Sequence, residues 1–270
     1  MPLFESLVHA ALHGATLFLP VSPSAHEWLL TRLAHLQEPD AATSAAMALG
    51  ALLALVVFFR HDWSSILSGL LQTILLRRRP MTLDERMPLF LLVATAPVLI
   101  FSSILASWLD APSWGPAAWA TILAGGAALL AFADRMSRKT RRWVDWNWVD
   151  ALGVGVAQAL SLVPGSGRFE ATWLLASARN YSLEAACKFA YYALLPLLIA
   201  DLVRMPPALM LGGAPWWHDV LITAMACAGG WVALGAVQKG LRLGRTLNGY
   251  LLYRLILAAG ALWVGWREGW

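Results

Sequence analysis

Long apolar segments recur along the 270-residue chain and constrain its fold more than any other feature. A helix needs about 20 apolar residues to cross the ~30 Å hydrocarbon core of a membrane. Six segments approach or reach that length: residues 41–59, 88–109, 117–133, 184–203, 220–238 and 249–266. The chain is 59% hydrophobic and only 13% charged, whereas a soluble domain is roughly half apolar and a quarter charged. These properties predict an all-α polytopic membrane protein with six transmembrane helices.

Basic residues cluster in three of the connections between these segments and predict the orientation of the chain. These connections are residues 60–86, residues 134–148 and a short one with Lys239, Arg242 and Arg245. Loops rich in Lys and Arg stay on the cytoplasmic side of a membrane, so we expect all three there. The connections 110–116 and 205–216 contain no Lys or Arg and are expected on the other side. Basic loops are attracted to anionic lipid on the cytoplasmic side of the membrane, which explains the net charge of +4. No nucleic-acid partner is expected.

Two further apolar segments, residues 3–36 and 148–178, are interrupted by prolines and glycines. The six crossings alternate correctly only if each of these segments begins and ends on the same side, so we expect two re-entrant helical hairpins. A hairpin followed by three crossings then occurs twice, and the odd number of crossings inverts the second copy. The sequence predicts one membrane domain, residues 1–270, made of inverted repeats at 1–134 and 148–270. Such an architecture places its site where the interrupted segments meet.

Polar side chains gather at both interruptions. Irregular backbone at membrane depth is tolerated only where protein or a water-filled cavity surrounds it. Helix starts beyond such a break expose backbone N–H groups, which bind anions. The candidate site residues are His13, Ser22, Ser24, His26 and Glu27 in the first segment and Gly165, Ser166, Arg168, Glu170 and Thr172 in the second.

Arg168 is the most informative candidate, because an arginine inside a membrane hairpin is costly without a partner. The planar fork of its guanidinium suits a phosphate or a carboxylate. A structural ion pair with Glu170 or Glu27 is the alternative explanation for its position.

The other candidates also have structural alternatives. His13 is equally well explained as a hydrogen-bonded packing residue, and Ser22 and Ser24 as caps of the helix that follows the break. His26 and Glu27 are neighbours on a helix and therefore point about 100° apart. These two side chains are not expected to face one ligand.

The first interruption has the sequence HGATLFLPVSPSAH, and the second contains PGSGRFEAT. They resemble two motifs of the BacA-type undecaprenyl-diphosphate phosphatase family, E/Q-G-x-T-E-F-L-P-V-S-S-x-G-H and P-G-x-S-R-S-x-x-T. Further similarities are LGALLALVVFF, QALSLVPG, FAYYALLP and YRLILAAG, so the resemblance covers nearly the whole chain. It implies a multi-pass protein of the bacterial inner membrane, with six crossings and two re-entrant hairpins. It also implies a site that opens toward the periplasmic face.

The resemblance further implies a ligand, a polyprenyl (undecaprenyl) diphosphate or phosphate, which is the lipid carrier of cell-envelope synthesis. Arg168 would hold the diphosphate together with Ser24, Ser166, Gly165 and Thr172. A divalent cation, Mg²⁺ or Ca²⁺, is expected from the family. Apart from the lipid and the membrane, a second copy of the chain or another membrane protein is compatible as a partner.

Several residues depart from the family pattern. His13 and Leu17 stand where the family has Glu or Gln and a second glutamate, and Pro23 replaces a serine proposed as nucleophile. Gly167 and Phe169 replace the serines beside the arginine. Because Mg²⁺ and Ca²⁺ prefer carboxylate oxygens, these departures leave the identity of the metal open.

The sequence therefore leaves two functions open. One is a rewired lipid diphosphate phosphatase, in which His26, Ser22 or His13 performs the chemistry. Glu27 or Glu170 would supply the missing carboxylate. The other is a non-hydrolytic relative that binds, senses or flips polyprenyl phosphate. Phosphoryl transfer requires neutralisation of the charge that grows in the transition state, so phosphate release distinguishes the two functions.

Overall fold

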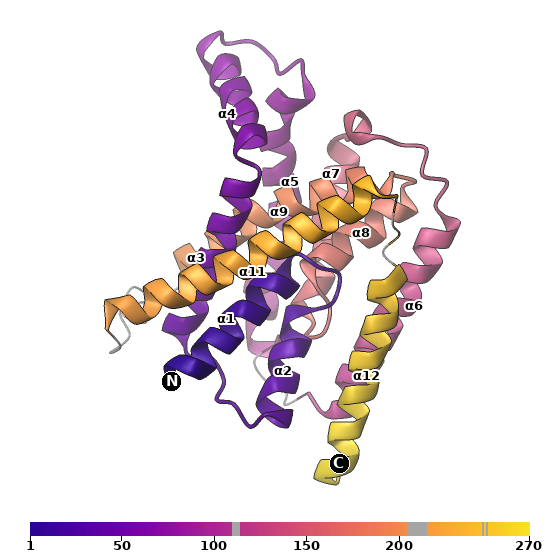
Figure 1. The fold of residues 1–270 in the computed structure, drawn as a ribbon. Helices are drawn as coiled ribbons and strands as arrows, with labels where there is room; N and C mark the ends of the chain where they lie inside the picture. The colour runs from indigo at the N-terminus through magenta and orange to yellow at the C-terminus, as the bar shows by residue number, and fades with distance from the viewer. Residues whose placement is uncertain (110–113, 205–214, 245, 247) are drawn as a thin grey trace.

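The computed structural model describes residues 1–109, 114–204, 215–244, 246 and 248–270, and these ranges form helices and no β-strand (Figure 1). Six helices are long and apolar enough to cross a membrane. They are α3 (Ala41–Phe58), α5 (Leu83–Leu109), α6 (Pro116–Met136), α9 (Leu183–Arg204), α11 (Trp216–Arg242) and α12 (Asn248–Glu268). The predicted all-α polytopic class and its six apolar spans are confirmed. Residues 110–113, residues 205–214 and Arg245, which entered the orientation argument, lie outside the described residues.

The connection 60–86, expected as a basic loop, is largely helical. Helix α4 (Arg60–Leu75) packs on α5, and the buried Ile66 and Gly69 lie on the packed face. Apolar residues at helical spacing explain this element, because they bury one face of α4 against a neighbour. The connection was predicted only from its basic residues, and its charge does not indicate whether it is helical.

Helix α5 begins at Leu83, five residues before the apolar run that predicted it. The residues in between include Asp84, Glu85 and Arg86, whose charges interrupt the run. Glu85 nevertheless belongs to the helix: its carboxylate accepts hydrogen bonds from the N–H groups of Met81 and Thr82 at 2.7 and 3.3 Å. These bonds satisfy free donors at the helix start, so the helix extends beyond its apolar portion.

Four shorter helices occupy the two interrupted segments. They are α1 (Leu3–Leu17), α2 (Pro23–Leu33), α7 (Trp148–Ala159) and α8 (Arg168–Ala178). At 1.5 Å per residue, α1 is about 22 Å long and α2 and α8 are about 16 Å long. Each is shorter than the ~30 Å hydrocarbon core. The breaks between them coincide with the Pro-rich and Gly-rich motifs.

Close helix packing positions the first interrupted segment. Helices α1 and α3 both pack along α11, and α12 packs along α6 (Figure 1). A Cβ atom at Gly14 would overlap the backbone carbonyl of Ala226 in α11, and one at Gly50 would overlap that of Thr223. Glycine at these contacts lets the backbones approach, as is common between membrane helices. The end of α1 is thereby held deep in the bundle.

Candidate functional site

The structure brings both interrupted segments to one cavity of about 510 Å³, here called the polar chamber. Helices α1, α2, α8 and α9 contribute its ionisable side chains. These are His13, Glu27, Arg168, Asp201 and Arg204. Two candidate hydroxyl residues, Ser24 and Ser166, also line the chamber, together with Leu17.

Arg168 is the first residue of α8 and forms a two-pronged ion pair with Asp201 of α9. The Nη1–Oδ2 and Nη2–Oδ1 distances are 2.7 and 3.2 Å. The sequence alternative for Arg168 was a pair with Glu170 or Glu27, and the partner in the structure is Asp201 instead. The carboxylate occupies the guanidinium fork in the geometry that a phosphate would use.

His13 and Glu27 form a second pair in the chamber, hydrogen-bonded with 2.7 Å between Nδ1 and Oε1. One full turn later on α1 comes Leu17, which faces the same cavity. A carboxylate that accepts a hydrogen bond from Nδ1–H favours the tautomer in which the imidazole proton is on Nδ1. Nε2 then carries no proton and can act as a base. The pair therefore has the arrangement of a general base and the group that orients it.

Direct hydrogen bonds join the two breaks. The backbone N–H of Gly165 donates to Ser24 Oγ at 3.2 Å. The backbone N–H of Ser22 donates to Glu170 Oε1 at 2.8 Å. Ser22 is fully buried and has a positive φ of 62°, which is rare for a residue other than glycine. Neither Ser22 nor Ser24 caps α2 through its side chain.

The remaining hydroxyl candidates divide between the chamber and the core. Ser166 Oγ donates to the carbonyls of Leu160 and Val163 at 2.6 and 2.7 Å, and its residue lines the chamber. Thr172 is fully buried, where its hydroxyl bonds to the Arg168 carbonyl at 3.0 Å and accepts from Gln158 at 2.9 Å. Ser166 can therefore meet a ligand in the chamber, whereas Thr172 holds the first turns of α8.

A buried ion pair connects the second break to α12. Arg254 Nη1 lies 2.6 Å from Glu170 Oε1, and Arg254 Nη2 donates to the Gly165 carbonyl at 3.2 Å. Only 1% of the Arg254 surface and 5% of the Glu170 surface are exposed. Glu170 thus neutralises Arg254 and holds the Ser22 N–H, and it lies in the core behind the breaks.

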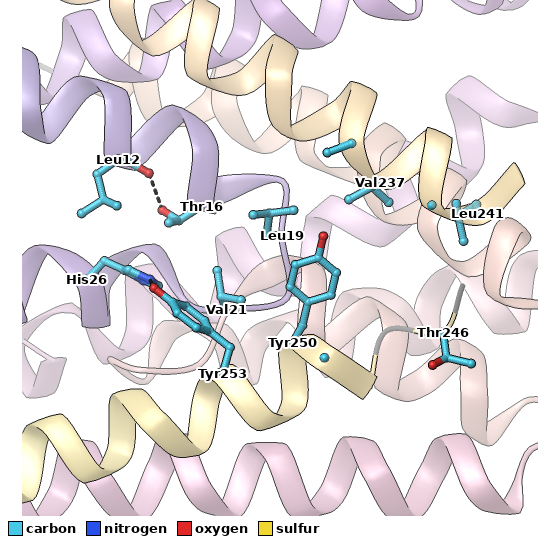
Figure 2. Close-up of a pocket in the computed structure, with 13 residues that line it drawn as sticks. Leu12, Thr16, Leu19, Val21, His26, Val237, Leu241, Thr246, Tyr250 and Tyr253 are labelled. Atoms are coloured by element: carbon cyan, nitrogen blue, oxygen red, sulfur yellow. Dashed lines mark hydrogen bonds between the residues drawn. The ribbon is translucent and has the colours of Figure 1, made fainter. Parts of the chain in front are cut away.

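His26 lines a different cavity, of about 580 Å³, together with Thr16, Tyr250 and Tyr253 (Figure 2). Its Nδ1 lies 2.8 Å from the Ser22 carbonyl, and its Nε2 lies 2.9 Å from the Tyr253 hydroxyl. A histidine whose Nδ1 donates to a carbonyl presents Nε2 as an acceptor, here for tyrosine. His26 and Glu27 therefore line different cavities, as their separation of about 100° on a helix predicts.

The chamber does not provide a recognisable divalent-cation site. Among the described residues, no group of three or more His, Cys, Asp or Glu side chains is placed to hold a metal ion. Both carboxylates of the chamber already pair with side chains: Glu27 binds His13, and Asp201 binds Arg168. These residues as arranged do not fit the Mg²⁺ or Ca²⁺ that the family resemblance implied.

Two residues of this region were not among the sequence candidates. Asp201 lies in the predicted span 184–203, and Arg254 lies in the motif YRLILAAG. A charged residue inside an apolar span is itself a signal of a buried partner or a ligand. That signal identifies both residues but does not say which partner each one meets.

The fold and the polar chamber together define a class of protein. It is a polytopic α-helical membrane protein with two arginines, a histidine and two carboxylates in a cavity at the interrupted helix pairs. The family model described as bacitracin resistance protein BacA matches residues 6–260. The chain belongs to the BacA family.

Curated relatives cover almost the whole chain. A protein of Thioalkalivibrio sulfidiphilus named undecaprenyl-diphosphatase is 31% identical over 277 residues, which span 98% of this chain and 100% of the relative. A protein of Roseobacter denitrificans with the same name is 33% identical over 261 residues, which span 95% of this chain and 96% of the relative.

Proposed function

We propose that this protein hydrolyses a polyprenyl diphosphate, such as undecaprenyl diphosphate, to the lipid monophosphate and inorganic phosphate. The observation that carries the proposal is the convergence of Arg168, His13 and Glu27 on one chamber between the two breaks. Phosphoryl transfer depends mainly on positioning and on neutralising charge, and these groups supply both. The names of the full-length relatives support the same substrate.

We place the protein in the bacterial inner membrane with the polar chamber open toward the periplasmic face. The basic connections 60–86 and 134–148 favour the cytoplasmic side. Helix α9 begins beside the second of these connections, where the Ser182 N–H donates to the Arg141 carbonyl at 2.8 Å, and Asp201 lies about one turn before the other end of α9. In this placement the two helix pairs are re-entrant hairpins, 3–36 and 148–178, in inverted repeats at 1–134 and 148–270.

The diphosphate binds by exchanging partners with Arg168. In the structure, Asp201 occupies the guanidinium fork, and a phosphate group that carries more negative charge takes its place when the lipid enters. The N–H groups in the first turn of α8 add donors at the same point, since helix starts bind anions. Ser24 and Ser166 provide hydroxyl groups on the chamber wall.

Replacing Asp201 by asparagine tests this exchange. The variant removes the competing charge, so the KM for the lipid should fall, by up to about fivefold, since partly exposed ion pairs contribute at most ~1 kcal/mol. Asp134→Asn is the matched control, because Asp134 pairs with Lys139 outside the chamber. A higher KM in Asp201→Asn would mean that Asp201 positions Arg168 and does not compete with the lipid.

His13 is the proposed general base. Its Nε2 accepts a proton from a water molecule, the water oxygen attacks the terminal phosphorus, and the bond from that phosphorus to the bridging oxygen breaks. The bridging oxygen keeps the electron pair and leaves as part of the lipid monophosphate. The proton on His13 then passes to the departing products, and Glu27 holds the imidazole in place throughout.

The variant His13→Gln should lower kcat on the order of a hundredfold and change KM little, because a general base acts in the transition state. Glu27→Gln should cause a smaller loss, since it orients the base. His26→Gln is the comparison, because His26 faces the other cavity. If His26→Gln caused the larger loss of kcat, the base would have to be reassigned.

Phosphate release from undecaprenyl diphosphate by the purified protein in detergent tests the function itself. The reaction is run with Mg²⁺, with Ca²⁺ and with a chelator, which also decides whether a divalent cation is used. Release of phosphate is the expected result. Binding of undecaprenyl phosphate without any release of phosphate would instead establish the non-hydrolytic alternative.

A further inference from the structure

We propose that an apolar groove between α6 and α8 holds the isoprenoid chain of the lipid whose diphosphate occupies the polar chamber. This inference rests on the proposed function. The cavity, here called the side groove, has a volume of about 300 Å³. Its apolar walls are formed by Ile122, Gly125, Leu129, Leu160, Ala171 and Leu174.

The mouth of the side groove lies on the outer surface of the bundle. Leu129 and Leu160 are 58% and 59% exposed. A Cβ atom at Gly125 would meet no atom within 4 Å, so the groove is open at that point. Since α6 is one of the membrane-spanning helices, the mouth faces the hydrocarbon region in which a polyprenyl chain is dissolved.

The inner end of the side groove meets the polar chamber. Ser166 and Gly167, the two residues before α8, line both cavities. A molecule that has its head in the chamber can therefore extend its chain past the start of α8 into the groove. The two cavities together have the polarity pattern of an amphiphile, with charged groups in one and apolar side chains in the other.

The surroundings of the groove distinguish this occupant from others. Glu170 and Arg254 line it as a neutralised pair. Arg254 Nε and Glu170 Oε2 have no hydrogen-bond partner within the part of the chain that the structure describes. Both atoms are enclosed in the core, so the occupant of the groove is identified by the junction with the polar chamber at Ser166 and Gly167. Free phosphate would leave the apolar walls uncovered, and a plain hydrocarbon chain would bring no anionic group to Arg168.

Photo-crosslinking tests the position of the chain without requiring turnover. The probe is a polyprenyl diphosphate analogue with a benzophenone on an isoprene unit near the head, added to the full-length protein in detergent and analysed by mass spectrometry. The label should fall on α6 or α8. Label confined to the cavity of Tyr250 and Tyr253 (Figure 2), or scattered over the bundle surface, would overturn the proposal.

The variant Gly125→Leu provides a second measurement. The added side chain has room in the fold and fills the groove, so labelling should fall by about tenfold, or ~1.4 kcal/mol of binding. Gly235→Leu is the matched control, because Gly235 on α11 also has no atom near its Cβ position. Equal labelling of both variants would overturn the proposal. Groove labelling in a protein that releases no phosphate would retain the groove and reject the hydrolysis.

Discussion

Replacement of Arg168 by alanine should lower kcat/KM for undecaprenyl diphosphate on the order of a thousandfold. Arginines that stabilise the transferred phosphoryl group typically contribute at least this much. In this chain the Arg168 guanidinium is the cation best placed to stabilise the transferred phosphoryl group, since Arg168 lies at the start of α8 and lines the chamber. Steady-state phosphate release measures the effect.

Two further variants make the Arg168 experiment specific. Arg168→Lys keeps the charge but loses the fork, so it should recover only part of the activity. Arg86→Ala removes an exposed arginine outside the chamber and should behave like the unmodified protein. Near-normal activity in Arg168→Ala would falsify the assignment of the diphosphate to this chamber.

Replacement of Arg254 by leucine should destabilise the fold by about 3–5 kcal/mol, because it leaves the Glu170 carboxylate buried without its partner. The double variant Glu170→Gln with Arg254→Leu should recover most of that loss. It contains no buried charge, and the amide oxygen of glutamine still accepts the Ser22 N–H bond. Thermal unfolding in detergent compares the three proteins.

Arg32→Leu is the matched control for this comparison. Its partner is Glu268, and both side chains are substantially exposed, so the loss should stay below about 1 kcal/mol. A double variant as unstable as Arg254→Leu alone would show that packing of the arginine side chain, and not its charge, stabilises this region.

The spans could be predicted from the sequence because run length and hydropathy alone decide whether a helix can cross a membrane. The breaks could be located for a similar reason, since Pro and Gly interrupt helices locally. Neighbouring residues on a helix point about 100° apart, and this angle depends only on helix geometry. The sequence therefore also predicted that His26 and Glu27 point in different directions, and they line different cavities.

The partners of the charged residues could not be predicted in the same way. Arg168 pairs with Asp201 on another helix, and Glu170 pairs with Arg254 on a third. These pairings depend on how the helices rotate and tilt against one another, which no local pattern of the sequence encodes.

The hydrogen bonds between the two breaks have a mechanical consequence. Gly165 is bound to Ser24 on one side and to Arg254 on the other, and Ser22 is bound to Glu170. A carrier that moves its cargo by rocking one half against the other would have to break the Gly165–Ser24 and Ser22–Glu170 bonds, which join the two halves, in every cycle. The bond from Arg254 to Gly165 holds the second break within its own half. These bonds at the centre of the protein suit a task in which the lipid head group stays at one depth.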